Sequence, residues 1–104
     1  MHKPCLIRFV VRAQIPTEAG NKMLQNPKFL QDLEDYIRKA KPEASYFFEA
    51  GGDRVMVFIV NMESPDIIPA IAEPLFQGFG ANVEFHPVMV FDDLKKAVQN
   101  LGKQ

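Results

Sequence analysis

Six consecutive apolar residues, running from Val55 to Val60, constrain the fold of this chain more than any other feature. A strand points alternate side chains to opposite faces, so an unbroken apolar run is apolar on both faces. Strands of this kind are covered on two sides and lie inside a sheet, not at its edge. The run therefore predicts a central strand over residues 54–62.

A strand is also predicted over residues 5–14, which are rich in β-branched and aromatic residues. Arg8 and Arg12 lie four positions apart, and an even spacing puts both side chains on one face of a strand. The other face then carries Ile7, Phe9 and Val11. This alternation predicts one face against a core and a second face that bears both arginines.

Turn residues and a proline indicate the two remaining strands. Residues 44–50 are joined to the central strand by Gly51-Gly52-Asp53, which has the composition of a hairpin turn. Residues 81–91 form the last predicted strand, and Pro87 in its middle removes one hydrogen-bond donor from the ladder. Because proline is tolerated at a sheet edge or in a bulge, Pro87 predicts one of these two settings.

The first helix is predicted in two pieces. A short piece covers residues 18–25, with Thr17 as its N-cap. Asn26 and Pro27 then repeat the start signal, so the main piece covers residues 27–40. Its apolar residues recur at helical spacing, at Leu30, Leu33, Ile37 and Ala40.

A second helix begins at Ser64-Pro65-Asp66 and stops at Gly78 and Gly80. Pro74 lies inside it and predicts a kink or the end of its regular part, because proline removes an internal hydrogen bond. Asp92-Asp93 then caps a short terminal helix. One face of that helix carries Leu94, Ala97, Val98 and Leu101.

The elements follow the order β-α-β-β-α-β with a terminal helix, in one domain spanning residues 1–104. With right-handed crossovers, this order predicts an α+β fold with a four-stranded antiparallel sheet. Numbered along the chain, the strands take the spatial order 4-1-3-2, and both helices cover one face. The doubly apolar third strand is then central, and the fourth strand, with Pro87, lies at an edge.

The face without helices predicts a homodimer. The arginine side of the first strand is its predicted surface, together with apolar side chains of the third strand and aromatic ones from Tyr46-Phe47-Phe48. Extended apolar surfaces of this kind mark interaction sites in soluble proteins. Pairing with a second copy across a two-fold axis covers such a surface, so the predicted partner is the chain itself.

Composition disfavours several other partners. The chain has 12 basic and 13 acidic residues, whereas nucleic-acid binders carry a basic surplus, so nucleic acid is not a predicted partner. No apolar run approaches the ~20 residues that span a bilayer, so no membrane partner is predicted. The first residues do not resemble a signal peptide, and the single cysteine, Cys5, forms no disulfide within the chain. These features predict a cytoplasmic protein.

The layout resembles the dimeric α+β barrel superfamily, in which two ferredoxin-like subunits press their sheets together into a barrel. Residues 41–94 are also similar to a family of small uncharacterised bacterial proteins. The resemblance rests on Lys41-Pro42-Glu43-Ala44, Tyr46-Phe47, Gly52-x-Arg54, Ile68-Pro69-Ala70-Ile71-Ala72-Glu73-Pro74-Leu75-Phe76 and Val83-Glu84-Phe85-His86-Pro87-Val88-Met89. It covers about half of the chain and implies no established activity. The superfamily includes cofactor-free monooxygenases, muconolactone-type isomerases, haem-degrading enzymes and proteins without known chemistry, so membership does not fix a function.

Arg8, Arg12, Glu84 and His86 form the sharpest candidate site. The first and fourth strands are predicted neighbours, so these four side chains are expected to converge on one face. In a catalytic interpretation, an arginine holds a carboxylate or enolate, His86 moves a proton and Glu84 orients the imidazole. In a structural interpretation, the same groups are an ion pair and a hydrogen-bonded histidine beneath a dimer interface. Both interpretations stay open.

The remaining motifs give weaker indications of function. Tyr46 is a candidate donor to a ligand oxygen, although a sheet aromatic is more often a packing residue. Two histidines and one cysteine without ligand spacing predict no metal site, and no cofactor motif is present. An RNA-recognition module would need glycine and aromatic residues where Val55 and Met56 stand, so that interpretation is rejected.

Two functional hypotheses follow. One is a dimeric protein that binds a small molecule or another partner without catalysis. The other is a cofactor-independent isomerase or monooxygenase that uses His86 with the two arginines in an enclosed cavity. A ligand-sized cavity lined by these residues favours the enzyme, and a packed interior contradicts it.

Overall fold

The computed structural model describes residues 6–103. Four strands are present, β1 (Ile7–Ile15), β2 (Ala44–Ala50), β3 (Asp53–Met62) and β4 (Asn82–Pro87). Four helices accompany them, α1 (Thr17–Gln25), α2 (Phe29–Ala40), α3 (Ile68–Phe79) and α4 (Phe91–Leu101), with a short 3-10 turn η1 (Pro65–Ile67) before α3. His2, Cys5 and the predicted start of the first strand lie outside the described residues.

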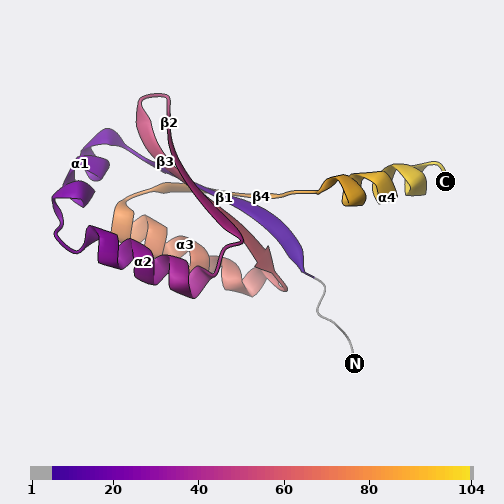
Figure 1. Cartoon of the computed structure of the whole chain (residues 1–104), viewed down its shortest axis with the longest axis horizontal. Coiled ribbons are helices and arrows are strands. Elements are labelled where there is room, and N and C mark those ends of the chain that lie inside the picture. The colour runs from indigo at the N-terminus through magenta and orange to yellow at the C-terminus, as the bar shows by residue number, and fades with distance from the viewer. Residues whose placement is uncertain (1–5, 104) are drawn as a thin grey trace.

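The strands form one antiparallel sheet in the order β2-β3-β1-β4 (Figure 1). This is the predicted order, given from the opposite edge. The apolar run 55–60 lies within β3, which pairs with β1 on one side and β2 on the other. β4 is an edge strand, as Pro87 predicted. The α+β class, the strand order and the place of the central strand are therefore confirmed.

The last strand is shorter than predicted. β4 ends at Pro87, so the proline is its final residue and does not lie in its middle. The predicted continuation to residue 91 is wrong, because proline supplies no donor to the ladder and the backbone leaves the sheet soon after it. Val88 makes a last contact, donating its N–H to the carbonyl of Arg8 at 2.9 Å.

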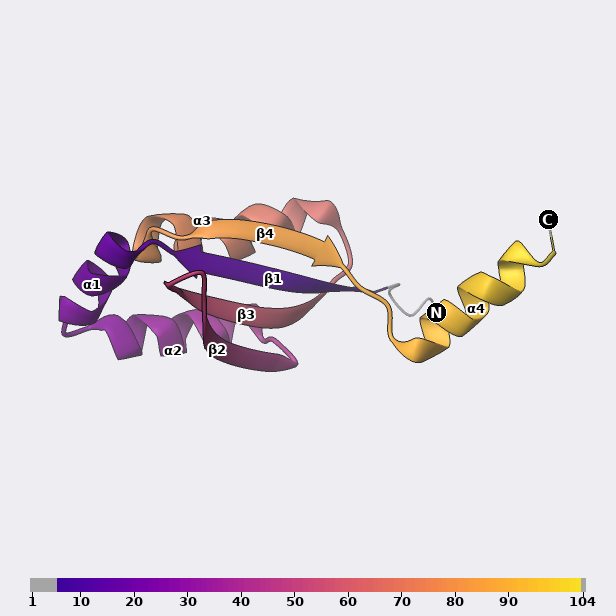
Figure 2. The same cartoon turned by 90° about the horizontal axis from the view of Figure 1, so that it is seen from above.

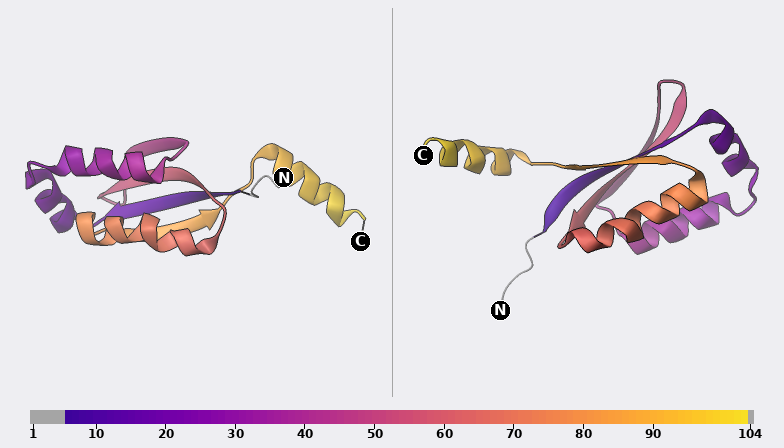
Figure 3. Two further views of the ribbon diagram at one scale, coloured as in Figure 1. Left: turned by 90° about the horizontal axis from the view of Figure 1, so that it is seen from below. Right: turned by 180° about the vertical axis from the view of Figure 1, so that it is seen from behind.

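The core lies between the sheet and the helices α2 and α3, which cover one of its faces (Figures 2 and 3). β1 contributes Val11, Ala13 and Ile15, which are completely buried. Alternation then places Arg8, Val10, Arg12 and Gln14 on the other side. We call this other side the open face, because no helix of the described chain packs on it. The prediction that the arginines lie away from the helices is confirmed.

The first two helices begin at different residues from those predicted. Thr17 is the first residue of α1 and does not cap it, since its hydroxyl donates to Asp53 Oδ1 at 3.3 Å. The predicted break between the two pieces is present, and Asn26 accepts the Lys28 N–H through Oδ1 at 3.0 Å. α2 therefore begins at Phe29, after this turn.

α3 continues through Pro74 to Phe79, so the proline does not end the helix. Its missing N–H leaves the carbonyl of Ala70, four residues earlier, without the usual helical donor. Gly80 supplies the predicted stop with φ of +63°, in the left-handed region that glycine enters without strain.

α4 projects from the sheet at the end opposite α1 and the β2–β3 turn (Figures 1 and 2). The three residues 88–90 connect it to β4, and none of its described residues is buried. The Cα radius of gyration is 16.4 Å, against ~13 Å for a compact domain of this length. The projecting helix gives the chain an elongated shape.

Candidate functional site on the open face of the sheet

The four predicted site residues lie on the open face, on the neighbouring strands β1 and β4. Arg12 is directly opposite Glu84, and Val10 is directly opposite His86. Because residues two apart on a strand point the same way, Glu84 and His86 share this face with Arg8 and Arg12. The pairing of β1 with β4 therefore places these residues on one face, where Glu84 contacts His86 while each arginine hydrogen-bonds to a different partner.

Glu84 and His86 form the first part of the site. Glu84 Oε2 lies 3.2 Å from His86 Nε2, and the two side chains are 56% and 59% exposed. The carboxylate is placed to orient the imidazole, which is one part of the predicted catalytic arrangement. The exposure of both groups means that only a covering partner would exclude water from them.

Arg12 takes part in a second arrangement. Its Nη1 donates to Gln14 Oε1 at 2.7 Å, and Gln14 Nε2 donates to Asp53 Oδ2 at 2.9 Å. These side chains are partly buried, and the chain of hydrogen bonds runs from the middle of β1 to the β2–β3 turn. In this state the guanidinium of Arg12 is directed along its own strand, although Glu84 is its cross-strand neighbour.

Arg8 belongs to a third arrangement, at the other end of β1. Its Nε donates to Glu43 Oε1 at 2.9 Å, and Asn61 donates to the same oxygen through its side-chain amide. These two hydrogen bonds, the one from Asn61 foremost, hold the pKa of Glu43 below its ordinary value. Glu43 and Asn61 were not predicted as site residues, because their proximity to Arg8 depends on the register of β1 against β3.

An apolar strip separates these polar groups. Val10 pairs with Ile59, and Arg12 pairs with Val57, which in turn pairs with Tyr46 on β2. Tyr46 is 59% exposed and its neighbour on the same face, Phe48, is 46% exposed. The predicted ligand donor Tyr46 therefore lies across β3 from the arginines, beside an uncovered apolar surface.

A hollow near Arg8 opens at the edge of this face, with a volume of about 420 Å³. It is lined by Leu6, Ile7, Arg8, Pro87, Val88, Met89 and Asp93. Arg8 is the one predicted site residue among them. Residues from β1, from the end of β4 and from the first turn of α4 build this hollow together.

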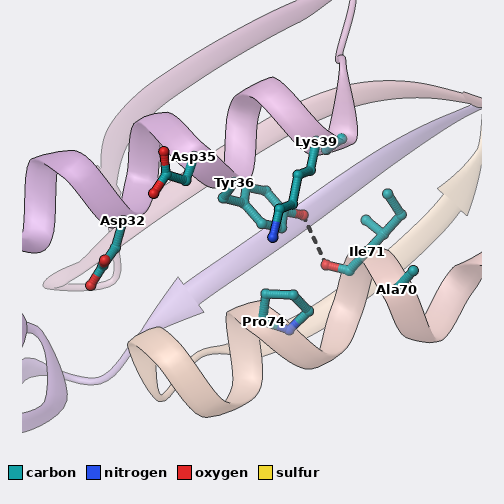
Figure 4. A pocket seen from close by; sticks show the side chains of 8 residues that line it. Asp32, Asp35, Tyr36, Lys39, Ala70, Ile71 and Pro74 are labelled. Atoms are coloured by element: carbon teal, nitrogen blue, oxygen red, sulfur yellow. Dashed lines mark hydrogen bonds between the residues drawn. The ribbon is translucent and has the colours of Figure 1, made fainter.

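Sequence reasoning missed a cleft on the helix side, between α2 and α3 (Figure 4). Its volume is about 390 Å³. Tyr36 donates its hydroxyl to the carbonyl of Ile71 at 2.9 Å, and burial raises the pKa of Tyr36. Lys39 and Asp35 approach from α2, while Pro74 forms the opposite wall. The one sequence signal for this cleft was Pro74, which breaks the regular hydrogen bonding of α3.

Two kinds of site are absent from residues 6–103, a metal cluster and a membrane-spanning helix. Within that range, no group of three His, Cys, Asp or Glu side chains is arranged to hold a metal ion. None of the helices there combines the length and the apolar character needed to cross a membrane.

Comparison of the chain with known protein families, with curated proteins and with solved structures found no match. The class of protein is therefore defined by the fold alone: an α+β chain with a four-stranded antiparallel sheet, helices on one face and an uncovered opposite face.

Proposed function

We propose that this chain is a ferredoxin-like subunit of a dimeric α+β barrel, in which two open faces meet and enclose a site for a small molecule or an interaction partner. The observation that carries this proposal is the open face itself. Val10, Val57 and Ile59 form a half-buried apolar strip on this face, beside the charged groups of β1 and β4.

The apolar part of the face supports a protein partner. Tyr46 and Phe48 remain about half exposed, beside the strip formed by Val57 and Ile59. Burial of such surface contributes about 25 cal/mol per Å² of apolar area. A second copy offers the same surface, so a two-fold axis lets apolar strip meet apolar strip.

Surface area gives a second argument for a partner. The accessible surface of the chain is 7576 Å², whereas a compact monomer of this mass exposes about 5,900 Å². The difference exceeds the ~800 Å² that one subunit contributes to a standard interface. The chain therefore exposes enough extra surface for an interface of standard size.

The polar groups beside the apolar strip suggest the chemistry of a ligand. Arg12 retains guanidinium donors beyond its hydrogen bond to Gln14, and arginine binds carboxylates through paired donors. His86 and Tyr46 add hydrogen-bonding groups from the outer strands β4 and β2. A small organic anion, such as a carboxylate or an enolate, matches this set of groups.

The experiment that tests the dimer compares two variants with the same added charge. Val57→Glu places a carboxylate in the apolar strip, and Gln77→Glu places one on the exposed surface of α3. Sedimentation equilibrium is expected to show a dimer for the unchanged protein and for Gln77→Glu, and a monomer for Val57→Glu. A monomeric unchanged protein at high concentration contradicts the proposal.

Native mass spectrometry of the dimer tests the ligand. A retained small molecule that is lost in Arg12→Ala supports binding at the enclosed face. If the dimer carries no added mass and a panel of small carboxylates fails to shift the His86 resonance, the site serves association alone.

A second candidate is a cofactor-independent isomerase or monooxygenase. The contact between Glu84 and His86 favours it, because a carboxylate-oriented imidazole is a proton-transfer group. The pairing of Arg8 with Glu43 and of Arg12 with Gln14 favours the binding protein instead. Turnover of unsaturated lactones or oxygen uptake with quinols, abolished by His86→Ala, would establish the enzyme.

A further inference from the structure

The apolar face of α4 has no partner among residues 6–103 of its own chain. Phe91, Leu94, Val98 and Leu101 recur at i, i+3, i+7 and i+10, so they share one side of the helix. They are 75%, 45%, 58% and 67% exposed. An isolated helix of this length is only marginally stable in water, so packing of this stripe would stabilise α4 considerably.

An apolar groove lies at the opposite end of the molecule, between the β2–β3 hairpin and the helices α1 and α2. Its volume is about 420 Å³. It is lined by Ile15, Met23, Leu24, Phe29, Leu30, Leu33, Phe47, Phe48, Arg54, Val55 and Met56. Leu24, Leu30 and Phe47 are more than half exposed there. The groove is therefore a second apolar surface that the described part of the chain leaves exposed.

We propose that α4 of one chain docks into this groove of a second chain, so that the dimer exchanges its C-terminal helices. This inference rests on the proposed dimer and adds a second contact region to it. The occupant is a copy of this chain, because α4 and the elements that line the groove, α1, α2 and the β2–β3 hairpin, lie at opposite ends of each molecule (Figure 1).

Chain geometry prevents α4 from reaching its own groove. Three residues, 88–90, separate it from β4, and extended chain spans at most about 3.3–3.6 Å per residue. The sheet lies between this connection and the β2–β3 turn, and the molecule is 55 Å long. We consider a two-fold axis that lies in the plane between the two open faces and runs perpendicular to the strands. Such an axis reverses the strand direction of the second copy relative to the first. Each α4 then lies beside the hairpin end of the other copy.

Recognition geometry agrees with this docking. Arg54 is the one charged residue among those that line the groove, and the other lining residues are apolar. Grooves that accept an amphipathic helix read anchors spaced by three and four residues, as in this stripe. The groove therefore offers an apolar floor for the anchors of this stripe.

A cysteine cross-link tests the exchange in the full chain. Leu30→Cys and Val98→Cys are made in separate chains that carry Cys5→Ser and different tags, and the two chains are co-expressed. Both positions are exposed, so neither change removes a core contact. Mild oxidation is expected to give a covalent heterodimer. The control replaces Val98→Cys with Lys96→Cys, which lies on the opposite side of α4 and is expected to form none.

Two outcomes overturn the exchange and are distinguishable from failure of the dimer itself. If sedimentation shows a dimer but the Leu30→Cys and Val98→Cys chains do not cross-link, the open faces pair without helix exchange. Equal cross-linking of the Lys96→Cys control also contradicts a docked α4. If sedimentation shows a monomer, the proposed dimer fails, and the exchange fails with it.

A non-covalent variant provides an independent measurement. Leu94→Glu places a charge in the stripe and is expected to raise the dimer dissociation constant by about tenfold or more. Lys96→Glu, on the polar side, is expected to leave it within about twofold. Circular dichroism compares the helix content of the Leu94→Glu monomer with that of the unchanged monomer. Equal spectra would mean that the substitution weakens docking without unfolding the monomer.

Discussion

At the scale of single residues, alternation along the strands located the open face, but it did not identify the partners of the charged side chains. The even spacing of Arg8 and Arg12 required one face for both arginines, and the structure confirms it. Their hydrogen-bond partners Glu43 and Gln14 depend on register and rotamer, which a sequence pattern does not encode. The candidate site was therefore predictable as a location and not as a network.

The ion pair between Arg8 and Glu43 leads to a prediction about pH. The pKa of Glu43 is lowered from its ordinary value of 4.5, so the folded state binds the proton less tightly than the unfolded state does. Stability from this group is present above about pH 4.5 and is lost as pH falls through the lower folded-state pKa. We expect Glu43→Gln to flatten the fall in the free energy of unfolding over that acid range.

Urea denaturation at a series of pH values measures this effect. The control is Glu34→Gln, which removes one carboxylate from an exposed helical pair with Arg38 and is expected to keep the acid dependence of the unchanged protein. An identical pH dependence for Glu43→Gln and the unchanged protein would show that Glu43 does not contribute to acid stability.

At the scale of elements, the strong signals were the strands and the helix ends. The bounds of β2 were predicted correctly, and Gly80 ends α3 as expected. The predictions were less definite at the two prolines, because each allows two local structures. Pro74 lies inside α3 and does not end it, which excludes one of its two predicted effects, and Pro87 ends β4 instead of interrupting it.

The two glycines near the end of α3 give a matched pair of predictions. Gly80→Ala forces a side chain into a left-handed backbone, and its Cβ would lie 3.1 Å from Ala19 Cβ. We expect a loss of about 1–2 kcal/mol in the free energy of unfolding. Gly78→Ala meets open space inside the helix, and we expect a gain of about 0.5 kcal/mol. Chemical denaturation of both variants measures the difference, and equal effects would contradict the role of φ.

At the scale of the whole molecule, the sheet order followed from the sequence, but the position of α4 did not. The doubly apolar β3 and the proline of β4 fix which strands are central and which are at an edge. No pattern in residues 91–101 indicates whether an amphipathic helix packs on its own sheet or on another chain, because both use the same apolar stripe. The short connection after Pro87 directs α4 away from the body of its own chain (Figure 1), which favours the proposed contact with another chain.

This arrangement predicts that the stability of α4 depends on protein concentration. A docked α4 is part of the dimer, whereas a free helix of this length exchanges its amide hydrogens almost as fast as an unfolded segment. Hydrogen exchange measured well above and well below the dimer dissociation constant is therefore expected to show protection of residues 94–101 only at the higher concentration. The amides shared by β1 and β3 remain protected at both, because their ladder lies within one chain. Protection of α4 that is unchanged by dilution would mean that the helix is held by its own chain. Rapid exchange of α4 in a fully formed dimer would mean that the open faces alone make the contact.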